Sequence, residues 1–240
     1  MIDPLSDEHF MKKALLEAEL ALEKGEVPVG VVVVAHGQII ARGHNLTETL
    51  TDVTAHAEMQ AITAAANYIG GKYLKDCTLY VTLEPCSHQG QTGPCANALI
   101  DAGVGRVVVA VEDPNPQVAG RGIAALRCAG IDVDVGEGAD QVEADLAGFL
   151  LRMRRGYGRI TLKIAMSLDG RTAMPSGESQ WITGEDARAD VQRLRAEADL
   201  MVTGVGTVLA DDCRLTLRAD ELPFDADAKG CLLYTSPSPR

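Results

Sequence analysis

Four residues in the first half of the chain restrict its possible folds more than any other feature: His56, Glu58, Cys86 and Cys95. The first two open an apolar pattern of helical period. Cys86 follows an apolar strand pattern, and Cys95 begins the next helical pattern. A fold that unites them must place a strand end beside two helix N-termini. One imidazole and two thiolates leave one tetrahedral position of a zinc ion open for water, which is typical of catalytic zinc.

The two helix starts also suit the chemistry of these side chains. Helix N-termini favour thiolate and other anions, so they stabilise the ligand forms of Cys86 and Cys95. Glu58 lies two residues after His56, where it can move protons rather than bind the metal. We predict that His56, Cys86 and Cys95 bind Zn²⁺ and that Glu58 is the catalytic acid and base.

Composition places the chain among ordinary globular proteins. It has 240 residues, of which 46% are hydrophobic and 23% charged, enough for one large domain or two modest ones. No apolar run reaches the length of a membrane span, and the N-terminus lacks the order of a signal peptide. We therefore expect a cytoplasmic protein, without a membrane partner, whose six cysteines bind metal or stay reduced. A net charge of −12 makes a nucleic-acid partner unlikely.

Apolar periodicity predicts alternating strands and helices, which imply a layered α/β sheet. A helix should follow Ser6 and end at Gly25, and a hairpin should turn at His36 and Gly37. Further helices are expected at 57–69, 93–103, 120–129 and 140–155, and strands at 77–83, 106–111 and 131–135. In the second half we expect an apolar strand from residue 159, a helix at 189–199, and a strand from residue 200 that leads into a glycine-rich turn.

The motifs resemble one known family. His-x-Glu followed by Pro-Cys is typical of zinc deaminases. TLEPCSHQGQTGPC and VEDPNPQVAGRGIAALRCAGIDVDVG resemble the deaminase domain of the bifunctional riboflavin-biosynthesis deaminase/reductase, and KIAMSLDGRTAMPSGESQWITG and LRAEADLMVTGVGTVLADDCRLTLR resemble the first half of its reductase domain. The resemblance implies a cytidine-deaminase-like three-layer α/β/α domain over 1–145 and part of a dihydrofolate-reductase-like α/β domain over 146–228. Residues 229–240 read as an unstructured tail.

The same resemblance implies a reaction and a set of contacts. The substrate would be 2,5-diamino-6-ribosylamino-4(3H)-pyrimidinone 5′-phosphate, deaminated with zinc. The reductase half would use NADPH on the resulting aminouracil, although its truncation predicts no measurable reduction. The residues expected to face NADPH are Ala165, Trp181, Thr207 and Asp211, and those expected to face the sugar phosphate are Ser179, Arg195, Leu215 and Arg218. Trp181 could instead be a core anchor.

Two further residues have open interpretations. Asn45 occupies a GHN segment where deaminases place a base-binding amide, but an Asn that caps a turn fits equally well. His88, between the two cysteines, could contact the substrate phosphate or lie in an exposed loop. We expect a homo-oligomer from the resemblance alone.

The first 80 residues resemble a different branch. EVPVGVVVV, IIARGHN and DVTAHAEMQAI are similar to the tRNA adenosine deaminases, which makes adenosine-to-inosine deamination of tRNA the alternative function. Because the two resemblances change over near Glu84, Pro85 and Cys86, we interpret the chain as a mosaic. A zinc-stabilised module without activity is a third reading, disfavoured by Glu58 and the open metal position.

Overall fold

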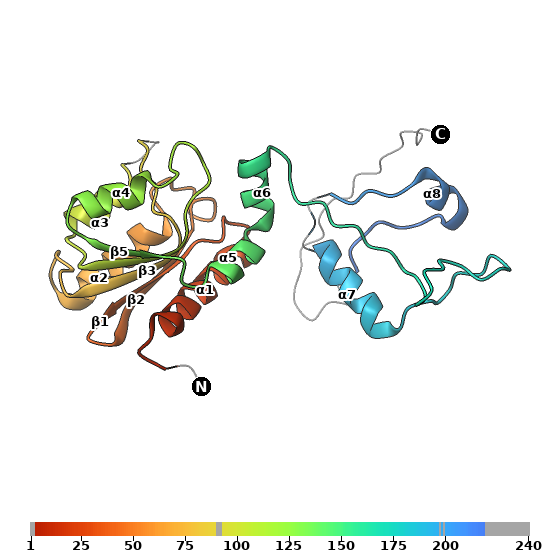
Figure 1. Ribbon diagram of the computed structural model, residues 1–240, viewed down its shortest axis with the longest axis horizontal. Helices are drawn as coiled ribbons and strands as arrows, with labels where there is room; N and C mark the ends of the chain where they lie inside the picture. The colour runs from red at the N-terminus through yellow and green to blue at the C-terminus, as the bar shows by residue number, and fades with distance from the viewer. Residues whose placement is uncertain (1–2, 90–92, 197, 199, 219–240) are drawn as a thin grey trace. The chain divides into compact units, whose positions relative to one another are not determined.

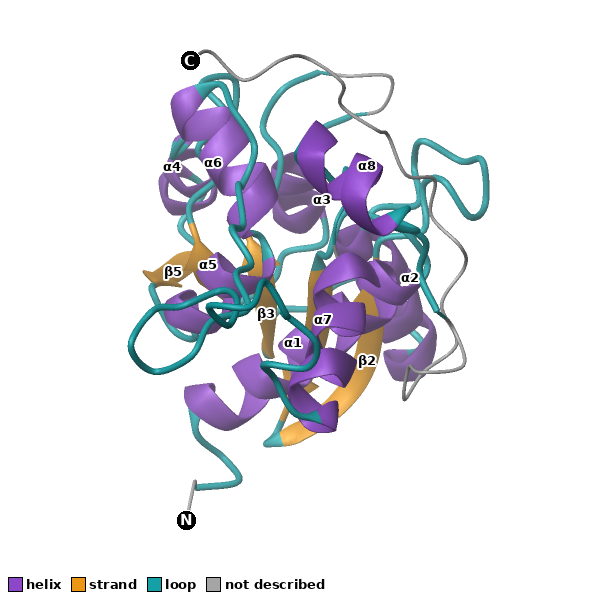
Figure 2. Ribbon diagram, turned by 90° about the vertical axis from the view of Figure 1, so that its right-hand side faces the viewer, coloured by secondary structure: helices purple, strands orange, loops and turns teal. Residues whose placement is uncertain are grey.

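The computed structural model describes residues 3–89, 93–196, 198 and 200–218. The chain divides into two compact units, Met1–Arg159 and Ile160–Arg240. Figure 2 colours strands orange, and all strands of the described residues belong to the first unit. No helix among the described residues combines the length and apolar composition needed to cross a bilayer.

The first unit is a five-stranded sheet between two layers of helices (Figure 1). Its strand order is β2-β1-β3-β4-β5, in which β1 is antiparallel to β2 and β3 while β3, β4 and β5 are parallel. One core cluster joins the sheet to α1, α5 and α6, and another joins the opposite face to α2, α3 and α4. The elements are α1 Asp7–Glu23, β1 Gly30–Ala35, β2 Gln38–His44, α2 Ala57–Ile69, β3 Cys77–Leu83, α3 Cys95–Asp101, β4 Arg106–Val111, α4 Arg121–Cys128, β5 Asp132–Val135, α5 Ala139–Asp145 and α6 Ala147–Arg155.

Local sequence signals account for several element ends. The Ser6 side chain accepts a hydrogen bond from the His9 N–H and caps α1. His36 and Gly37 have positive φ angles of 50° and 76°, which suit the tight turn between β1 and β2. Gly70 ends α2 in the left-handed region. These predicted boundaries are confirmed, and so is the three-layer α/β/α arrangement.

Burial on both faces explains the unbroken apolar run of β1. Val31 and Val33 belong to the core cluster on the α2 side, whereas Val32 and Val34 belong to the cluster on the α1 side. Successive side chains of a strand point to opposite faces, so a strand covered on both faces needs apolar residues at every position. The central strands therefore sit rigidly between the layers and fix the ends at which the site residues lie.

The single helix predicted over 140–155 is wrong, because the chain forms α5 and α6 with a break at Leu146. Leu146 has φ −91° and ψ 10°, outside helical geometry. The change of direction keeps Leu146 and Leu150 in the same buried cluster as Met11 of α1. This packing also places α6 in the first unit, so the compact units divide after Arg159 rather than after residue 145, where the sequence suggested a domain boundary.

The second unit contains two described helices, α7 Glu185–Ala196 and α8 Val205–Asp211. The helix expected at 189–199 is confirmed in α7 as far as Ala196, and residues 197 and 199 lie outside the described residues. The strands expected from residues 159 and 200 are not formed where the structure describes the chain, and α8 replaces the glycine-rich turn. Extended segments become strands only when neighbouring strands satisfy their N–H and C=O groups. Ile160 is 89% exposed and Leu162 is 81% exposed, so the apolar side of the first segment is uncovered. The predicted tail, 229–240, lies outside the described residues.

A polar network ties the start of α1 to the sheet. The guanidinium of Arg106 donates to both carboxylate oxygens of Asp7, at 2.9 and 2.7 Å, and its Nε donates to Asp134 at 2.9 Å. The Tyr80 hydroxyl donates to Asp7 at 2.7 Å. The hydrogen bonds from Arg106 hold the pKa of Asp7 below its usual range. The network therefore fixes α1 to β3, β4 and β5.

Asp7→Asn should lower the free energy of unfolding at pH 7 by about 1 kcal/mol. The effect is smaller than for a fully buried ion pair because the Asp7 side chain is 36% exposed and solvent screens its charge. A carboxylate whose folded pKa is depressed stabilises the fold above its unfolded pKa, and this contribution is lost as the pH falls through the folded value. The difference between the two proteins should therefore begin to shrink below about pH 4, the ordinary value for Asp, and vanish only below the depressed folded pKa of Asp7. Denaturant unfolding between pH 7 and pH 3 measures it. Glu8→Gln, a surface carboxylate of the same helical turn, should change stability by less than about 0.5 kcal/mol, and an equal loss in both variants would contradict the role of Arg106.

Candidate active site

The three predicted metal ligands come together at one edge of the sheet. His56 is the N-cap of α2, Cys86 follows β3, and Cys95 is the first residue of α3. One ligand atom of each, an imidazole nitrogen or a sulfur, lies within 4.8 Å of the others. The structure therefore confirms the convergence of a strand end and two helix N-termini.

His56 occupies a position usually held by a side chain that caps the helix. Its backbone is extended, with φ −67° and ψ 151°, and its side chain makes no capping hydrogen bond. Ser, Thr, Asp or Asn at an N-cap would turn back to the first-turn N–H groups. The imidazole instead faces the cysteines, and its Nδ1 lies 3.5 Å from the Cys95 sulfur.

The Cys86 sulfur lies against the start of α3. The Cys95 main-chain N–H donates to the Cys86 sulfur at 3.2 Å, and the Ala96 N–H donates to the Cys86 carbonyl at 3.1 Å. A hydrogen bond from the Cys95 thiol, with further help from His56, lowers the pKa of Cys86 to about 4. The same hydrogen bond and burial raise the pKa of Cys95. Cys86 is thus a thiolate in the pH range in which proteins bind zinc.

Glu58 lies in the first turn of α2 and is 4% exposed. Burial raises the pKa of its carboxyl to about 7, with a further upward contribution from the negative charge of Cys86. A carboxyl with a pKa near the working pH can both accept and return a proton. This pKa suits Glu58 to act as an acid and a base, whereas a carboxylate that is always charged could act only as a base.

The donor set fits a zinc ion. Two sulfurs and one imidazole nitrogen are ligands that zinc binds tetrahedrally, and three protein ligands leave a fourth position for water or substrate. The ligand atoms are close enough to one another for a single ion to contact all three. The Glu58 carboxyl adjoins them, since its charge raises the pKa values of His56 and Cys95 and the charge of Cys86 raises the pKa of Glu58.

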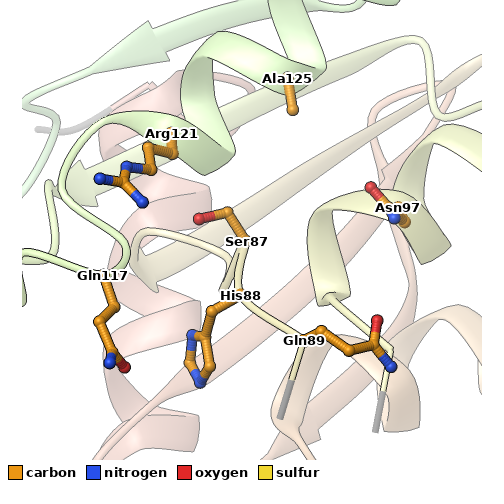
Figure 3. Close-up of a pocket in the computed structure, with 7 residues that line it drawn as sticks. All are labelled: Ser87, His88, Gln89, Asn97, Gln117, Arg121 and Ala125. Atoms are coloured by element: carbon orange, nitrogen blue, oxygen red, sulfur yellow. The ribbon is translucent and has the colours of Figure 1, made fainter.

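A pocket of about 390 Å³ is lined in part by the residues that directly follow Cys86 in the chain (Figure 3). It is lined by Ser87, His88, Gln89, Asn97, Gln117, Arg121 and Ala125. Figure 3 shows the Ser87 hydroxyl pointing toward the side of the pocket on which Arg121 lies. The Ser87 hydroxyl is buried and has no hydrogen-bond partner within the described chain. A polar ligand would supply that partner.

The structure places the two residues with open interpretations differently. His88 is exposed and lines this pocket. Asn45 is 8% exposed and directly follows β2, where its main-chain N–H donates to the Val29 carbonyl at 3.1 Å. Asn45 therefore extends the β1–β2 ladder toward the loop that leads to His56. Both substrate contacts stay predictions.

The predicted reductase residues fall in the second unit and are only partly assembled. Arg195 donates to the Thr216 carbonyl at 2.9 Å, and the Arg218 N–H donates to the Gln192 side chain at 3.2 Å, so α7 lies against the segment that holds Leu215 and Arg218. Trp181 is 70% exposed and stacks under the Arg188 guanidinium, 4.7 Å from the ring centre, which excludes a core position.

The other reductase positions give less information. Ser179 and Thr207 are exposed and Ala165 is half-buried. Asp211 is the last residue of α8, and its side chain lies outside the described part of the structure. The roles of all these residues toward NADPH or a sugar phosphate stay predictions.

Sequence reasoning missed several residues near the site. Glu84 is a buried carboxylate at the end of β3, and Arg121 and Gln117 line the pocket. Asp113 is 9% exposed, and burial raises the pKa of its carboxyl. For Glu84 the sequence contained a signal. A glutamate directly after an unbroken apolar strand is expected to be buried, and its carboxylate then needs hydrogen-bond partners.

Two family models match the chain. Residues 4–111 match the cytidine and deoxycytidylate deaminase zinc-binding region, and residues 159–227 match the RibD C-terminal domain. The fold and the site thus define a zinc-binding deaminase domain, followed by part of a reductase-type domain.

Relatives extend this match. The riboflavin biosynthesis protein RibD of Escherichia coli (strain K12) is 49% identical over 226 residues, which cover 93% of this chain and 59% of that protein. RibD of Haemophilus influenzae is 50% identical over 195 residues, 81% of this chain and 50% of that protein. The structure of Acinetobacter baumannii RibD, form 1, is 42% identical with a TM-score of 0.77 and covers 96% of this chain and 64% of its own.

The chain belongs to the family of the riboflavin biosynthesis protein RibD. It spans only about half the length of the curated relatives it matches. A structure from a study of tRNA:A34 deaminases is 38% identical with a TM-score of 0.50, and covers 57% of this chain and 97% of its own. That structure covers more of this chain than its first 80 residues, so it does not single out that segment, and the RibD match runs through the predicted change-over. The mosaic origin stays a hypothesis.

Proposed function

We propose that the first unit is a zinc-dependent deaminase that acts on 2,5-diamino-6-ribosylamino-4(3H)-pyrimidinone 5′-phosphate in riboflavin biosynthesis. The observation that carries the proposal is the cluster of His56, Cys86 and Cys95 beside the buried Glu58. A zinc ion held by the three ligands supplies a water activated near neutral pH. The family membership supports the substrate.

Glu58 performs the proton transfers of this reaction. Its carboxylate accepts a proton from the attacking water, and its protonated form returns protons to the ring nitrogen and to the departing amine, so that ammonia leaves. Burial suits it to both steps, because it brings the pKa of the carboxyl to about 7. Asn45 would orient the base by its amide.

The pocket after Cys86 would hold the phosphate end of the substrate. Arg121 offers a guanidinium to the pocket, Ser87 offers an unpartnered hydroxyl, and His88 and Gln117 line the same space. A guanidinium and a hydroxyl are well suited to phosphate oxygens. The position of the pocket, next to a metal ligand, matches a substrate whose base and phosphate are separated by one ribose.

For the second unit we propose an NADPH-dependent reductase domain that residues 160–218 do not complete. No strand is formed within the described residues of this unit, and Ile160 and Leu162 are exposed. The homo-oligomeric state and the cytoplasmic location also stay proposals. Deamination of tRNA, the alternative from the sequence, is the second candidate function; the similarity to a structure from a study of tRNA:A34 deaminases keeps it testable, but the RibD match over 93% of this chain does not favour it.

Ammonia release distinguishes the two candidate functions. The zinc-loaded protein should release ammonia from the pyrimidine phosphate and none from a tRNA anticodon stem-loop. Arg121→Ala should raise the KM for the pyrimidine phosphate by roughly 10 to 100-fold and change kcat little, because it removes one charged contact of about 1.5 to 3 kcal/mol made equally in ground and transition states. Arg127→Ala, on the same helix but outside the pocket lining, is the control. Activity on the stem-loop alone would overturn the proposed substrate.

A further inference from the structure

Glu84 holds an unusual position for a carboxylate. It lies between the end of β3 and Cys86 and is only 3% exposed. A buried carboxylate is costly unless hydrogen bonds satisfy its oxygens. Its partners therefore indicate why the chain places a charge there.

Four main-chain N–H groups satisfy Glu84. One carboxylate oxygen accepts from Asp113 at 3.2 Å and from Gly120 at 2.9 Å. The other accepts from Gly122 at 2.9 Å and from Ile123 at 3.1 Å. These donors belong to the loop after β4 and to the first turn of α4. The carboxylate thus holds both ends of the segment 113–123.

This arrangement replaces an ordinary helix cap. The N-cap of α4 is Gly120, which has no side chain to accept from the first-turn N–H groups. Glu84 supplies the missing acceptor from another part of the chain, and its charge is favourable at a helix N-terminus. The main chains of α4 and of the segment before Cys86 also lie in close contact, since a Cβ on Gly122 would be 2.2 Å from the Pro85 carbonyl oxygen. No side chain fits at position 122, where α4 meets the segment that carries Cys86.

The two walls of the pocket are the two segments that Glu84 joins. Ser87 and His88 follow Cys86 directly, whereas Gln117 and Arg121 belong to the segment 113–123. Figure 3 shows them facing the same space. The hydrogen bonds of Glu84 therefore join the two walls to each other.

We propose that Glu84 is a positioning residue, whose carboxylate holds the wall with Gln117 and Arg121 where the pocket accepts the phosphate end of the substrate. Glu84 itself does not line the pocket. The inference rests on the proposed function, and it adds a residue that acts on substrate binding through the main chain of a neighbouring helix.

Glu84→Gln tests the proposal, because glutamine keeps the size of the side chain but places an NH₂ group against two N–H donors. The KM for the pyrimidine phosphate should rise roughly 10 to 100-fold with kcat little changed, the pattern of lost uniform binding. The nucleoside without the phosphate should be affected less than about threefold. Zinc content should stay at one ion per chain. Hydrogen exchange should quicken at 113–123 and not at β1.

Glu112→Gln is the matched control, because it removes the same charge from an exposed position of the same loop. It should leave both substrates unaffected. Equal effects of Glu84→Gln on the phosphorylated and unphosphorylated substrates, or loss of zinc, would give Glu84 a purely structural role and overturn the proposal. If Glu84→Gln does not fold, Glu84→Asp, which keeps the charge with a shorter reach, should show the same contrast between substrates, and wild-type kinetics would refute it.

A binding measurement separates this proposal from the proposed function. Ribose 5-phosphate should bind to the zinc-loaded protein, and Glu84→Gln should weaken that binding roughly tenfold or more by calorimetry. If the unaltered protein released no ammonia but showed this difference, the proposed function would fail and the role of Glu84 would stand. Equal binding by both proteins would reject the role of Glu84 whatever the activity.

Discussion

Glu58→Gln should abolish ammonia release while the protein keeps its zinc. We expect kcat to fall at least about 1000-fold, because general acid and base catalysis contributes factors of 10² to 10⁴ and Glu58 serves several proton transfers. Glutamine has nearly the same shape, so the buried site should stay packed. Stopped-time assays of ammonia with the pyrimidine phosphate measure the loss, and metal analysis of the same samples measures the zinc.

The assignment of Glu58 depends on separating proton transfer from metal binding. His56→Ala is the contrasting variant, because it removes a predicted ligand and should lower both zinc content and activity. Glu58 is 4% exposed and adjoins both cysteines, so a structural effect on the metal would appear as zinc loss. Retained deamination in Glu58→Gln, or zinc loss equal to that of His56→Ala, would refute a role restricted to proton transfer.

The site residues were predictable because each lies at the end of an element. Helical and strand periodicity located the start of α2, the end of β3 and the start of α3, and parallel strands with crossing helices bring such ends to one edge of a sheet. The Pro85-Cys86 and His56-x-Glu58 motifs then supplied the chemistry. The layered fold followed from the same alternation, and the apolar run of β1 is explained by two covered faces.

Other features could not be read from local pattern. The roles of Glu84 and Arg121 depend on which loop the fold places beside Cys86, and that is decided by strand order rather than by spacing along the chain. The break at Leu146 follows from packing against α1. Strand propensity from residue 159 failed because a strand requires partners, which local sequence does not provide.

Gly43 presents a different case, in which the absence of a side chain determines the geometry of the site. It lies in β2 beneath α2, and a Cβ there would be 2.5 Å from the Ala57 carbonyl oxygen and 2.9 Å from the Ala61 nitrogen. Real Cβ contacts are not this short, so alanine must move the main chain of α2 away from the sheet. Gly30 admits α1 on the opposite face in the same way, with the Ala14 oxygen at 2.0 Å.

Gly43→Ala should lower the free energy of unfolding of the metal-free protein by about 3 kcal/mol, the upper part of the range for overpacking, because two main-chain atoms cannot rotate out of the way. Gly148→Ala is the control: no atom lies within 4 Å of its Cβ position, and Gly148 is in α6. Alanine there should stabilise the protein by roughly 0.5 to 1 kcal/mol. Denaturant unfolding of both variants measures the difference, and equal stabilities would show that α2 tolerates the shift.

The same substitution should also weaken zinc binding, because His56 is the N-cap of α2 and Glu58 lies in its first turn. A shift of this turn moves the imidazole relative to Cys86 and Cys95, which are held by β3 and α3. Zinc competition with a chelator should therefore give a larger loss of affinity for Gly43→Ala than for Gly30→Ala, since Gly30 contacts α1, which carries no ligand. If the two variants lost zinc affinity equally, the effect would come from general destabilisation and not from the position of α2.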